Sequence, residues 1–217
     1  MVPLPEPAPF FANVAIDTFY QGGPIMWPIV VVAVVAVAAM LERAVWWRIQ
    51  SSRRDVRLRE RVLMAVDGGE LDEATRLAAT SKDSVLRVIW HGLTHHHISL
   101  QGAMQVQAGE ELERAGRFLP VLDTIITLAP LLGLLGTVTG IMRAFQVVGE
   151  SELAIKGVSG GISEALIATA CGLAIAIASL LPFNYFQRRV ARLRFELETN
   201  ASNLELMIER AKGARSA

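Results

Sequence analysis

The chain has 217 residues, and 52% of them are hydrophobic, a share too high for an ordinary soluble domain. Its 21 basic residues balance its 21 acidic residues, so net charge gives no indication of nucleic-acid binding. The single cysteine, Cys171, lies inside an apolar run, which excludes a disulfide framework and a cysteine-based metal site. Composition therefore favours an integral membrane protein.

Three apolar runs are each long enough to cross the hydrocarbon core as a helix, which takes roughly 20 residues. They occupy residues 25–41, 120–148 and 162–187. Trp27 lies near one end of the first run, and Trp46 follows its other end, as in an interfacial aromatic belt. The predicted fold class is an all-α membrane protein with three transmembrane helices.

The basic residues predict one orientation for all three spans. Residues 1–41 contain no Lys or Arg, whereas residues 42–119 contain twelve and residues 188–217 contain seven. Because positive charge concentrates on the cytoplasmic side, the N-terminus is predicted outside and the C-terminus in the cytoplasm. The segments between and beside the spans are then 1–24 outside, 42–119 in the cytoplasm, 149–161 as a short outer loop, and 188–217 as a cytoplasmic tail.

The cytoplasmic segments are predicted to be long helical extensions of the spans. Apolar residues at helical spacing continue the first span to about residue 66, where Asp67, Gly68 and Gly69 break the pattern. Short helices are predicted at 71–79 and 83–93. From about residue 99 a helix continues into the second span with Pro120 as a kink, and the tail continues the third span.

The second run carries polar and small residues that a simple membrane anchor does not need. Asp123, Thr127 and Thr137 share one face of a helical wheel. A neighbouring strip of small residues allows close helix packing in lipid; it comprises Gly133, Gly136 and Gly140. We interpret this span as tightly packed and lining a polar path. The alternative is a plain packing face in which each threonine bonds to its own helix.

The third run contains one charge, Glu164. A carboxylate within a span is costly and is a functional hypothesis by default, although a position near the outer end also allows snorkelling. Glu164 and Thr169 border an arc of small residues that is predicted to pack against protein; it includes Ala168, Gly172 and Ala176. Helical rise places Thr137 and Thr169 at similar depths, about 24 and 26 Å from the cytoplasmic ends.

Two further charges in the second span have open roles. Arg143 lies near the outer end of the span, where pairing with Glu164, pairing with Glu150 and snorkelling are all possible. Asp123 lies at the cytoplasmic entrance, as a helix cap or as part of a proton exit.

Four histidines gather in the cytoplasmic segment, at His91 and His95–His97. Consecutive histidines in a polar turn lack the fixed geometry of a metal site, so a solvated linker is favoured over metal binding. No GxSxG or Walker motif is present in the sequence. We therefore expect neither an enzyme nor a resident metal or cofactor.

Two segments resemble the paired signature of the ExbB/TolQ/MotA proton-channel family: APLLGLLGTVTGIMRAF (129–145) and GISEALIATACGLAIAIA (161–178). The early segment GGPIMWPIVVVAVVAVAAMLER (22–43) is most similar to the ExbB/TolQ branch. By this resemblance, Thr137 matches the threonine of the first motif, and Glu164 and Thr169 match the glutamate and threonine of the second.

The resemblance implies a multi-pass protein of the bacterial inner membrane, with residues 1–24 and 149–161 in the periplasm. It implies a homopentamer around the membrane helices of a smaller ExbD-, TolR- or MotB-type partner that carries an essential aspartate. Proton flow would then drive work for TonB-dependent transport or Tol-type envelope maintenance, through a TonB- or TolA-type protein. The alternatives are a flagellar-stator (MotA-like) subunit, a structural scaffold without conduction, and a transporter or metal-handling protein that uses the histidines.

Overall fold

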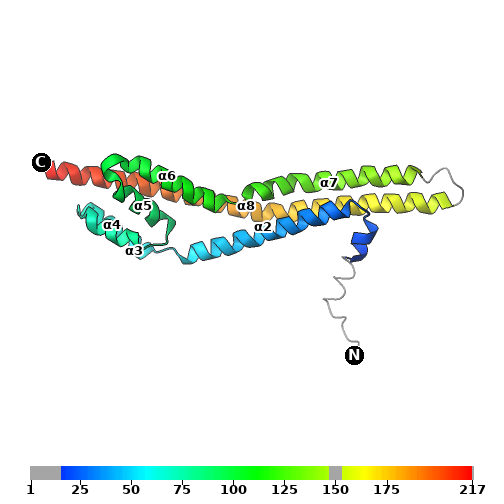
Figure 1. Ribbon diagram of the computed structural model, residues 1–217, viewed down its shortest axis with the longest axis horizontal. Helices are drawn as coiled ribbons and strands as arrows, with labels where there is room; N and C mark the ends of the chain where they lie inside the picture. The colour runs from blue at the N-terminus through cyan, green and yellow to red at the C-terminus, as the bar shows by residue number, and fades with distance from the viewer. Residues whose placement is uncertain (1–15, 147–152, 217) are drawn as a thin grey trace, which may run out of the picture. The chain divides into compact units, whose positions relative to one another are not determined.

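The computed structural model describes residues 16–146 and 153–216, and every regular element in these ranges is an α-helix. After a helical turn that ends at residue 21, the helices are α2 (Met26–Ser52), α3 (Val56–Asp67), α4 (Leu71–Ala79), α5 (Ser84–Thr94), α6 (His96–Gly116), α7 (Leu119–Gln146) and α8 (Leu153–Ser216) (Figure 1). In these ranges, the stretches containing α2, α7 and α8 are long and apolar enough to cross a membrane. The predicted all-helical fold with three long apolar helices is confirmed.

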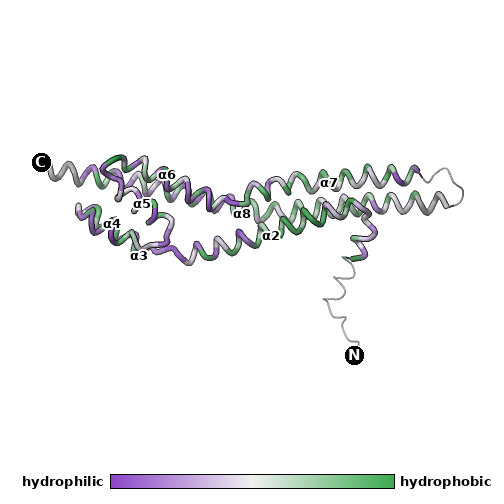
Figure 2. Tube along the Cα trace, viewed as in Figure 1, coloured by the Kyte–Doolittle hydropathy of each residue, from purple (hydrophilic) through white to green (hydrophobic). Residues whose placement is uncertain are grey.

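The chain divides into two compact units. The apolar unit comprises Met1–Leu41 and Pro120–Phe183, and the polar unit comprises Glu42–Leu119 and Asn184–Ala217. Figure 2 shows this division, with hydrophobic residues along α7 and hydrophilic residues frequent over α3 to α6. The helices α2 and α8 contribute to both units, because each continues past its uncharged run into charged sequence.

The apolar unit is held together by small contacts between long helices. Met26 and Ile29 of α2 bury their side chains against Ala168 of α8. Many large apolar side chains of this unit point outward, including Val31, Leu131 and Leu181, each about 60% exposed or more. Exposing such a surface to water along whole helices is unfavourable, whereas contact with lipid or with other apolar helices is not.

The polar unit has a conventional soluble core. The helices α3 to α6 pack in succession, and their apolar faces meet around fully buried side chains: Val62, Val66, Leu86, Ile89, Leu93 and Met104. Amphipathic spacing along these short helices accounts for this arrangement. Asp55 caps α3 and Asp83 caps α5, each by accepting a backbone N–H at the start of its helix.

Three charged side chains are buried in the described part of the polar unit, and each has polar partners. Asp83, the cap of α5, accepts the backbone N–H groups of Val85 and Asp55. Arg43 is 1% exposed and donates to the carbonyls of Arg114 (2.9 Å) and Ala115 (3.2 Å) at the end of α6. Glu111 is 2% exposed; it accepts from the Ser84 hydroxyl at 2.6 Å and pairs with Arg87. Buried charges persist where such partners compensate for lost hydration.

The predicted helix from the first span to residue 66 is wrong in one respect. The helix ends at Ser52, and a new helix begins at Val56. The Asp55 carboxylate accepts the backbone N–H of Leu58 at 2.9 Å, so a cap starts α3 where periodicity alone predicts continuity. The predicted break at residues 67–69 is confirmed, because α3 ends at Asp67 and Gly69 adopts a φ of 78°.

The second span is also not continuous with the helix before it. The helix α6 ends at Gly116 and α7 begins at Leu119, with Phe118 between them at a φ of 65°. Pro120 is the second residue of α7, where a missing N–H is tolerated, and so the chain turns before the proline. By contrast, α8 is a single helix of 64 residues, as predicted for the third span and its tail.

Candidate functional site

The α7–α8 contact in the apolar unit is built from facing strips of small residues. A Cβ at Gly136 would lie 2.5 Å from the Cβ of Ala168, and one at Gly140 would lie 2.8 Å from the Gly161 carbonyl oxygen. A Cβ at Gly172 would overlap the Ala129 carbonyl oxygen. From the sequence we expected these strips to form contacts between copies, whereas the structure places them against each other within one chain.

Thr169 lies at the centre of this contact. Its hydroxyl donates to the backbone carbonyl of Gly133 on α7 at 3.0 Å, so it does not bond only to its own helix. The carbonyl is reachable because Gly133 has no side chain; a Cβ there would lie 3.0 Å from the Thr169 Cα. The Thr169 oxygen retains lone pairs that can accept a proton from water or from an acid.

Thr137 and Thr127 bond within α7. The Thr137 hydroxyl donates to the Leu134 carbonyl at 2.6 Å, and that of Thr127 donates to the Thr124 carbonyl at 2.9 Å. Local bonding, the alternative raised by the sequence, therefore holds for these two residues and not for Thr169. Thr137 follows Gly133, the partner of Thr169, by about one helical turn, so both hydroxyls belong to one zone of the α7–α8 pair.

Thr137 also lines an apolar cavity of about 350 Å³ between α7 and α8. The other walls are carbon-lined and include Ile141, Phe145, Ile162 and Leu166. All four of these residues are more than 40% exposed, so the cavity opens on the surface of the single chain. Thr137 therefore contributes carbon surface to an apolar recess.

Glu164 and Arg143 form an ion pair near the C-terminal end of α7. Arg143 Nη1 lies 2.6 Å from Glu164 Oε1, and the side chains are 47% and 17% exposed respectively. Of the three possibilities left open for Arg143, the structure selects Glu164; Glu150 lies outside the described residues. Each charge supplies the partner that an ionised group in a span needs.

Gly23 lies against the Glu164 carboxylate of this ion pair, and its role was not predicted from the sequence. Its φ is 71°, and any Cβ there would overlap the Glu164 carboxylate. The Gly22-Gly23 pair before α2 is a signal for such a close approach, since only glycine combines this φ with an absent side chain. The carboxylate is thus enclosed by α7, α8 and the turn before α2.

Two more polar groups lie in the part of this unit away from the ion pair. Asp123 is exposed and is the fifth residue of α7, so the helix-cap role is wrong and the proton-exit role stays a prediction. Ser179 of α8 is fully buried, and its hydroxyl has no hydrogen-bond partner among the described residues. The sequence did not indicate this orphaned hydroxyl.

The histidines form stacked pairs in the polar unit. The ring centroids of His91 and His95 are 4.5 Å apart, and those of His96 and His97 are 3.7 Å apart. His95 and His96 each place Nδ1 against a backbone carbonyl, of His91 and Leu93 respectively. Within residues 16–146 and 153–216, no group of three or more His, Cys, Asp or Glu side chains could hold a metal ion.

Comparison with known proteins identifies the group to which these features belong. Residues 80–199, more than half of the chain, match the MotA/TolQ/ExbB proton channel family. The chain belongs to this family. The match covers the α7–α8 contact with both threonines and the Arg143–Glu164 pair, whereas Gly23 lies outside the matched residues.

The relatives lie in the ExbB/TolQ branch, as the sequence motifs predicted. The chain is 34% identical to putative biopolymer transport protein ExbB-like 3 of Synechocystis, over 87% of this chain and 92% of that one. It is 30% identical to biopolymer transport protein ExbB of Salmonella typhimurium, over 83% of each chain. It is also 40% identical to Tol-Pal system protein TolQ of Haemophilus influenzae, over 41% of this chain and 39% of that one.

Proposed function

We propose that this protein is the ring-forming subunit of a bacterial inner-membrane motor that converts proton motive force into mechanical work. Five copies would surround the membrane helix of a single-span partner of the ExbD or TolR type. The work would pass to a TonB- or TolA-type protein, for transport or envelope maintenance. The family match across both motif-bearing spans is the observation that carries this proposal.

The α7–α8 geometry supports a path for protons along these helices. The hydroxyls of Thr137 and Thr169 donate to the carbonyls of two successive α7 residues, Leu134 and Gly133, on a largely apolar pair of helices. Each hydroxyl donates to a carbonyl, which leaves its oxygen to accept from water or from the acid of a partner. One chain alone cannot enclose such a path, because polar groups in lipid need surrounding protein.

The Arg143–Glu164 pair supports a different role at the outer end. The Glu164 carboxylate is already engaged by the Arg143 guanidinium at 2.6 Å, a contact between α7 and α8. We therefore assign the pair to shaping and charging the outer entrance, and Asp123 to the cytoplasmic exit. The acid that takes up and releases each proton belongs to the partner in this mechanism.

Proton flux through co-reconstituted proteoliposomes tests the proposal. The full chain and its single-span partner are reconstituted together, and an internal pH dye reports flux after a potential is imposed. Thr169→Val and Thr137→Val keep side-chain shape and remove the hydroxyl. Loss of one such hydrogen bond, worth about 1.4 kcal/mol, lowers flux about tenfold. Native mass spectrometry checks that the complex still assembles.

Thr139→Val is the matched control. The Thr139 hydroxyl donates to the carbonyls of Leu135 and Gly136, both on its own helix, at 3.1 Å each. It should leave flux unchanged, because Thr139 lies about 160° around α7 from Thr137 and does not line the recess that Thr137 lines. If both test variants assemble and conduct as well as this control, the hydroxyls are packing groups and this path is wrong. If the unmodified protein conducts no protons either with or without its partner, a structural scaffold would be supported instead.

A further inference from the structure

A second feature, separate from the α7–α8 contact, lies wholly in the polar unit. A groove of about 510 Å³ runs between α2 and α8. Its walls combine arginines with aromatic and aliphatic side chains: Val45, Trp47, Arg48, Tyr185, Phe186 and Arg189. Nothing in the proposed motor function uses this groove.

The charged residues that line the groove are all positive. Arg48 and Arg189 are among its lining residues, and no acidic residue is. Neither arginine forms an ion pair with any residue that the structure describes. Arg189 is instead oriented by the Tyr185 hydroxyl, which it contacts at 2.7 and 3.1 Å, and its guanidinium lies 5.8 Å from the centre of the Trp47 ring.

A neighbouring arginine shows the contrast. Arg54 is paired with Glu196, and this hydrogen bond raises the pKa of the Arg54 guanidinium above its ordinary value. Its charge is thus already compensated. The two groove arginines remain available to an anion, and a planar guanidinium is well suited to the paired oxygens of a phosphate.

The uncharged surface of the groove indicates that the anionic ligand also has an apolar part. Val45 and Tyr185 are 57% and 52% exposed, so carbon surface is open beside the cations. The indole N–H of Trp47 is buried and has no hydrogen-bond partner among the described residues. A free inorganic ion would use the arginines but leave the exposed carbon surface in water.

The position of the groove along both helices matches a lipid headgroup. On α2, the first groove residue, Ala44, follows the last residue of the uncharged run, Leu41, by less than one turn. On α8, Tyr185 similarly follows Phe183, the last residue that α8 contributes to the apolar unit. Aromatic and basic residues just beyond a span are typical of the headgroup region.

We propose that this groove binds an anionic glycerophospholipid of the adjoining leaflet. Its phosphate lies between Arg48 and Arg189, and its glycerol and upper acyl region contact Val45, Tyr185 and Phe186. The bound lipid links α2 to α8 beyond the spans. This inference depends on the membrane-spanning assignment of the apolar helices and is independent of ion conduction.

Lipid titration of the purified full chain tests the proposal. The protein in a neutral detergent is titrated with dioleoyl phosphatidylglycerol, and native mass spectrometry counts retained lipids. The double variant Arg48→Gln, Arg189→Gln should bind it about 25-fold more weakly, since each arginine near anionic headgroups contributes about fivefold. Arg48→Lys, Arg189→Lys keeps both charges and should recover most of the affinity.

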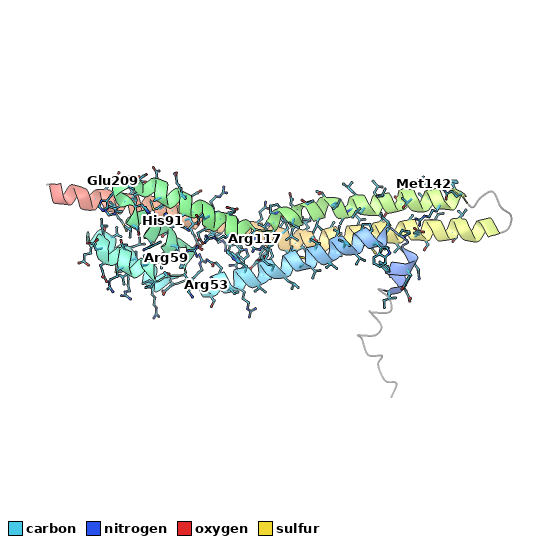
Figure 3. All side chains as sticks on the ribbon, viewed as in Figure 1. Arg53, Arg59, His91, Arg117, Met142 and Glu209 are labelled. Carbon is cyan, nitrogen blue, oxygen red and sulfur yellow. The ribbon has the colours of Figure 1, made fainter. Side chains whose placement is uncertain are left out.

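The matched control is Arg53→Gln, Arg57→Gln, which removes the same charge from exposed positions outside the groove. Arg53 lies near the end of α2 (Figure 3). The control should bind phosphatidylglycerol like the unmodified protein, and circular dichroism should show equal helicity in all variants.

Four outcomes would overturn the proposal. Equal binding by the double variant and the control would make the effect one of general charge. Equal binding of dioleoyl phosphatidylcholine would remove the anion requirement. Competition by millimolar inorganic phosphate would identify a free-anion site. No retained lipid on the unmodified protein would mean that another chain, such as a second copy, covers the groove.

Discussion

At the scale of single residues, the apolar unit combines charges and hydroxyls that lipid alone would penalise. Arg143 and Glu164 compensate each other, and Thr169 bonds to a carbonyl exposed by a glycine. Each of these groups therefore has a partner on another helix. Among the described residues of this unit, Ser179 is buried without a hydrogen-bond partner.

Replacing Glu164 and replacing Arg143 should lower the stability of the protein by different amounts. Glu164→Gln keeps an oxygen that can accept from Arg143, so the loss of thermal stability in detergent should be small. Arg143→Gln leaves a partly buried carboxylate without its cation, and should cost about 1–3 kcal/mol of stability. Differential scanning fluorimetry of the purified protein measures both.

The exchanged pair, Arg143→Glu with Glu164→Arg, separates pairing from position. If the pair only neutralises two charges, the exchange should recover most of the stability lost in Arg143→Gln. Equal stability of Arg143→Gln and the unmodified protein would show that the 2.6 Å contact contributes nothing. Proton flux of Glu164→Gln should fall less than that of Thr169→Val.

The sequence could identify these residues but not their partners. Glu164 and Arg143 stand out because charge is rare in apolar runs. Which of the three possibilities holds for Arg143 depends on the rotation of α7 against α8, and a helical wheel of one helix does not define that rotation. Gly23 was missed because its role appears only when the Glu164 carboxylate is placed against the turn before α2.

At the scale of elements, the glycines determine how closely α7 approaches α8. A methyl group at Gly172 would overlap the Ala129 carbonyl oxygen, whereas one at Gly160, on the same helix, would meet no atom within 4 Å. Gly172→Ala and Gly160→Ala raise helix propensity equally, by about 1 kcal/mol. Their difference in stability therefore reports the contact alone.

We expect Gly172→Ala to lower the melting temperature and Gly160→Ala to maintain or raise it. The overlapped atom belongs to the backbone and cannot move aside as a flexible side chain can. The methyl group must therefore push the helices apart, at a cost of about 1–3 kcal/mol. Thermal unfolding followed by circular dichroism distinguishes the two variants. Similar melting temperatures would mean that α7 and α8 accommodate a methyl group without loss.

The end of α6 depends on Arg43. This side chain lies on α2, and its guanidinium occupies the position of a C-terminal cap for the Arg114 and Ala115 carbonyls. Arg43→Met retains much of the buried volume and removes the cap. Two hydrogen bonds to a charged donor are lost, so we expect a destabilisation of about 2–4 kcal/mol.

Limited trypsin digestion can localise that effect. Arg117 lies at the break between α6 and α7 (Figure 3), and an uncapped α6 end should expose it to cleavage. Faster cleavage after Arg117 is expected in Arg43→Met and not in the control Arg53→Met, whose substituted side chain is exposed. Unchanged digestion in both would show that the α6 end does not need Arg43.

The helices themselves were largely predictable from sequence periodicity. The bounds of α4 agree with the expected 71–79, and α5 differs from the expected 83–93 by one residue at each end. The break at residues 53–55 was not predicted, because hydropathy does not report the Asp55 cap. The break at residues 117–118 falls just before Pro120, where the sequence predicted a kink within a continuous helix.

At the scale of the whole molecule, charge divides the chain as clearly as hydropathy does. Residues 42–119 and 188–217 carry nineteen of the 21 basic residues, and the described parts of both belong to the polar unit. A protein whose basic segments share one compact unit should present both on one side of the membrane.

Cysteine accessibility tests that topology in cells. In a Cys171→Ala background, single cysteines at positions 10, 70 and 209 are treated with a membrane-impermeant maleimide; Glu70 and Glu209 are exposed in the structure. Because the basic residues are retained in the cytoplasm, position 10 should react in intact cells, whereas 70 and 209 should react only after permeabilisation. Reaction of 70 and 209 from opposite sides would contradict the shared polar unit. Reaction of both in intact cells would invert the orientation, and with it the direction of proton flow from Glu164 to Asp123.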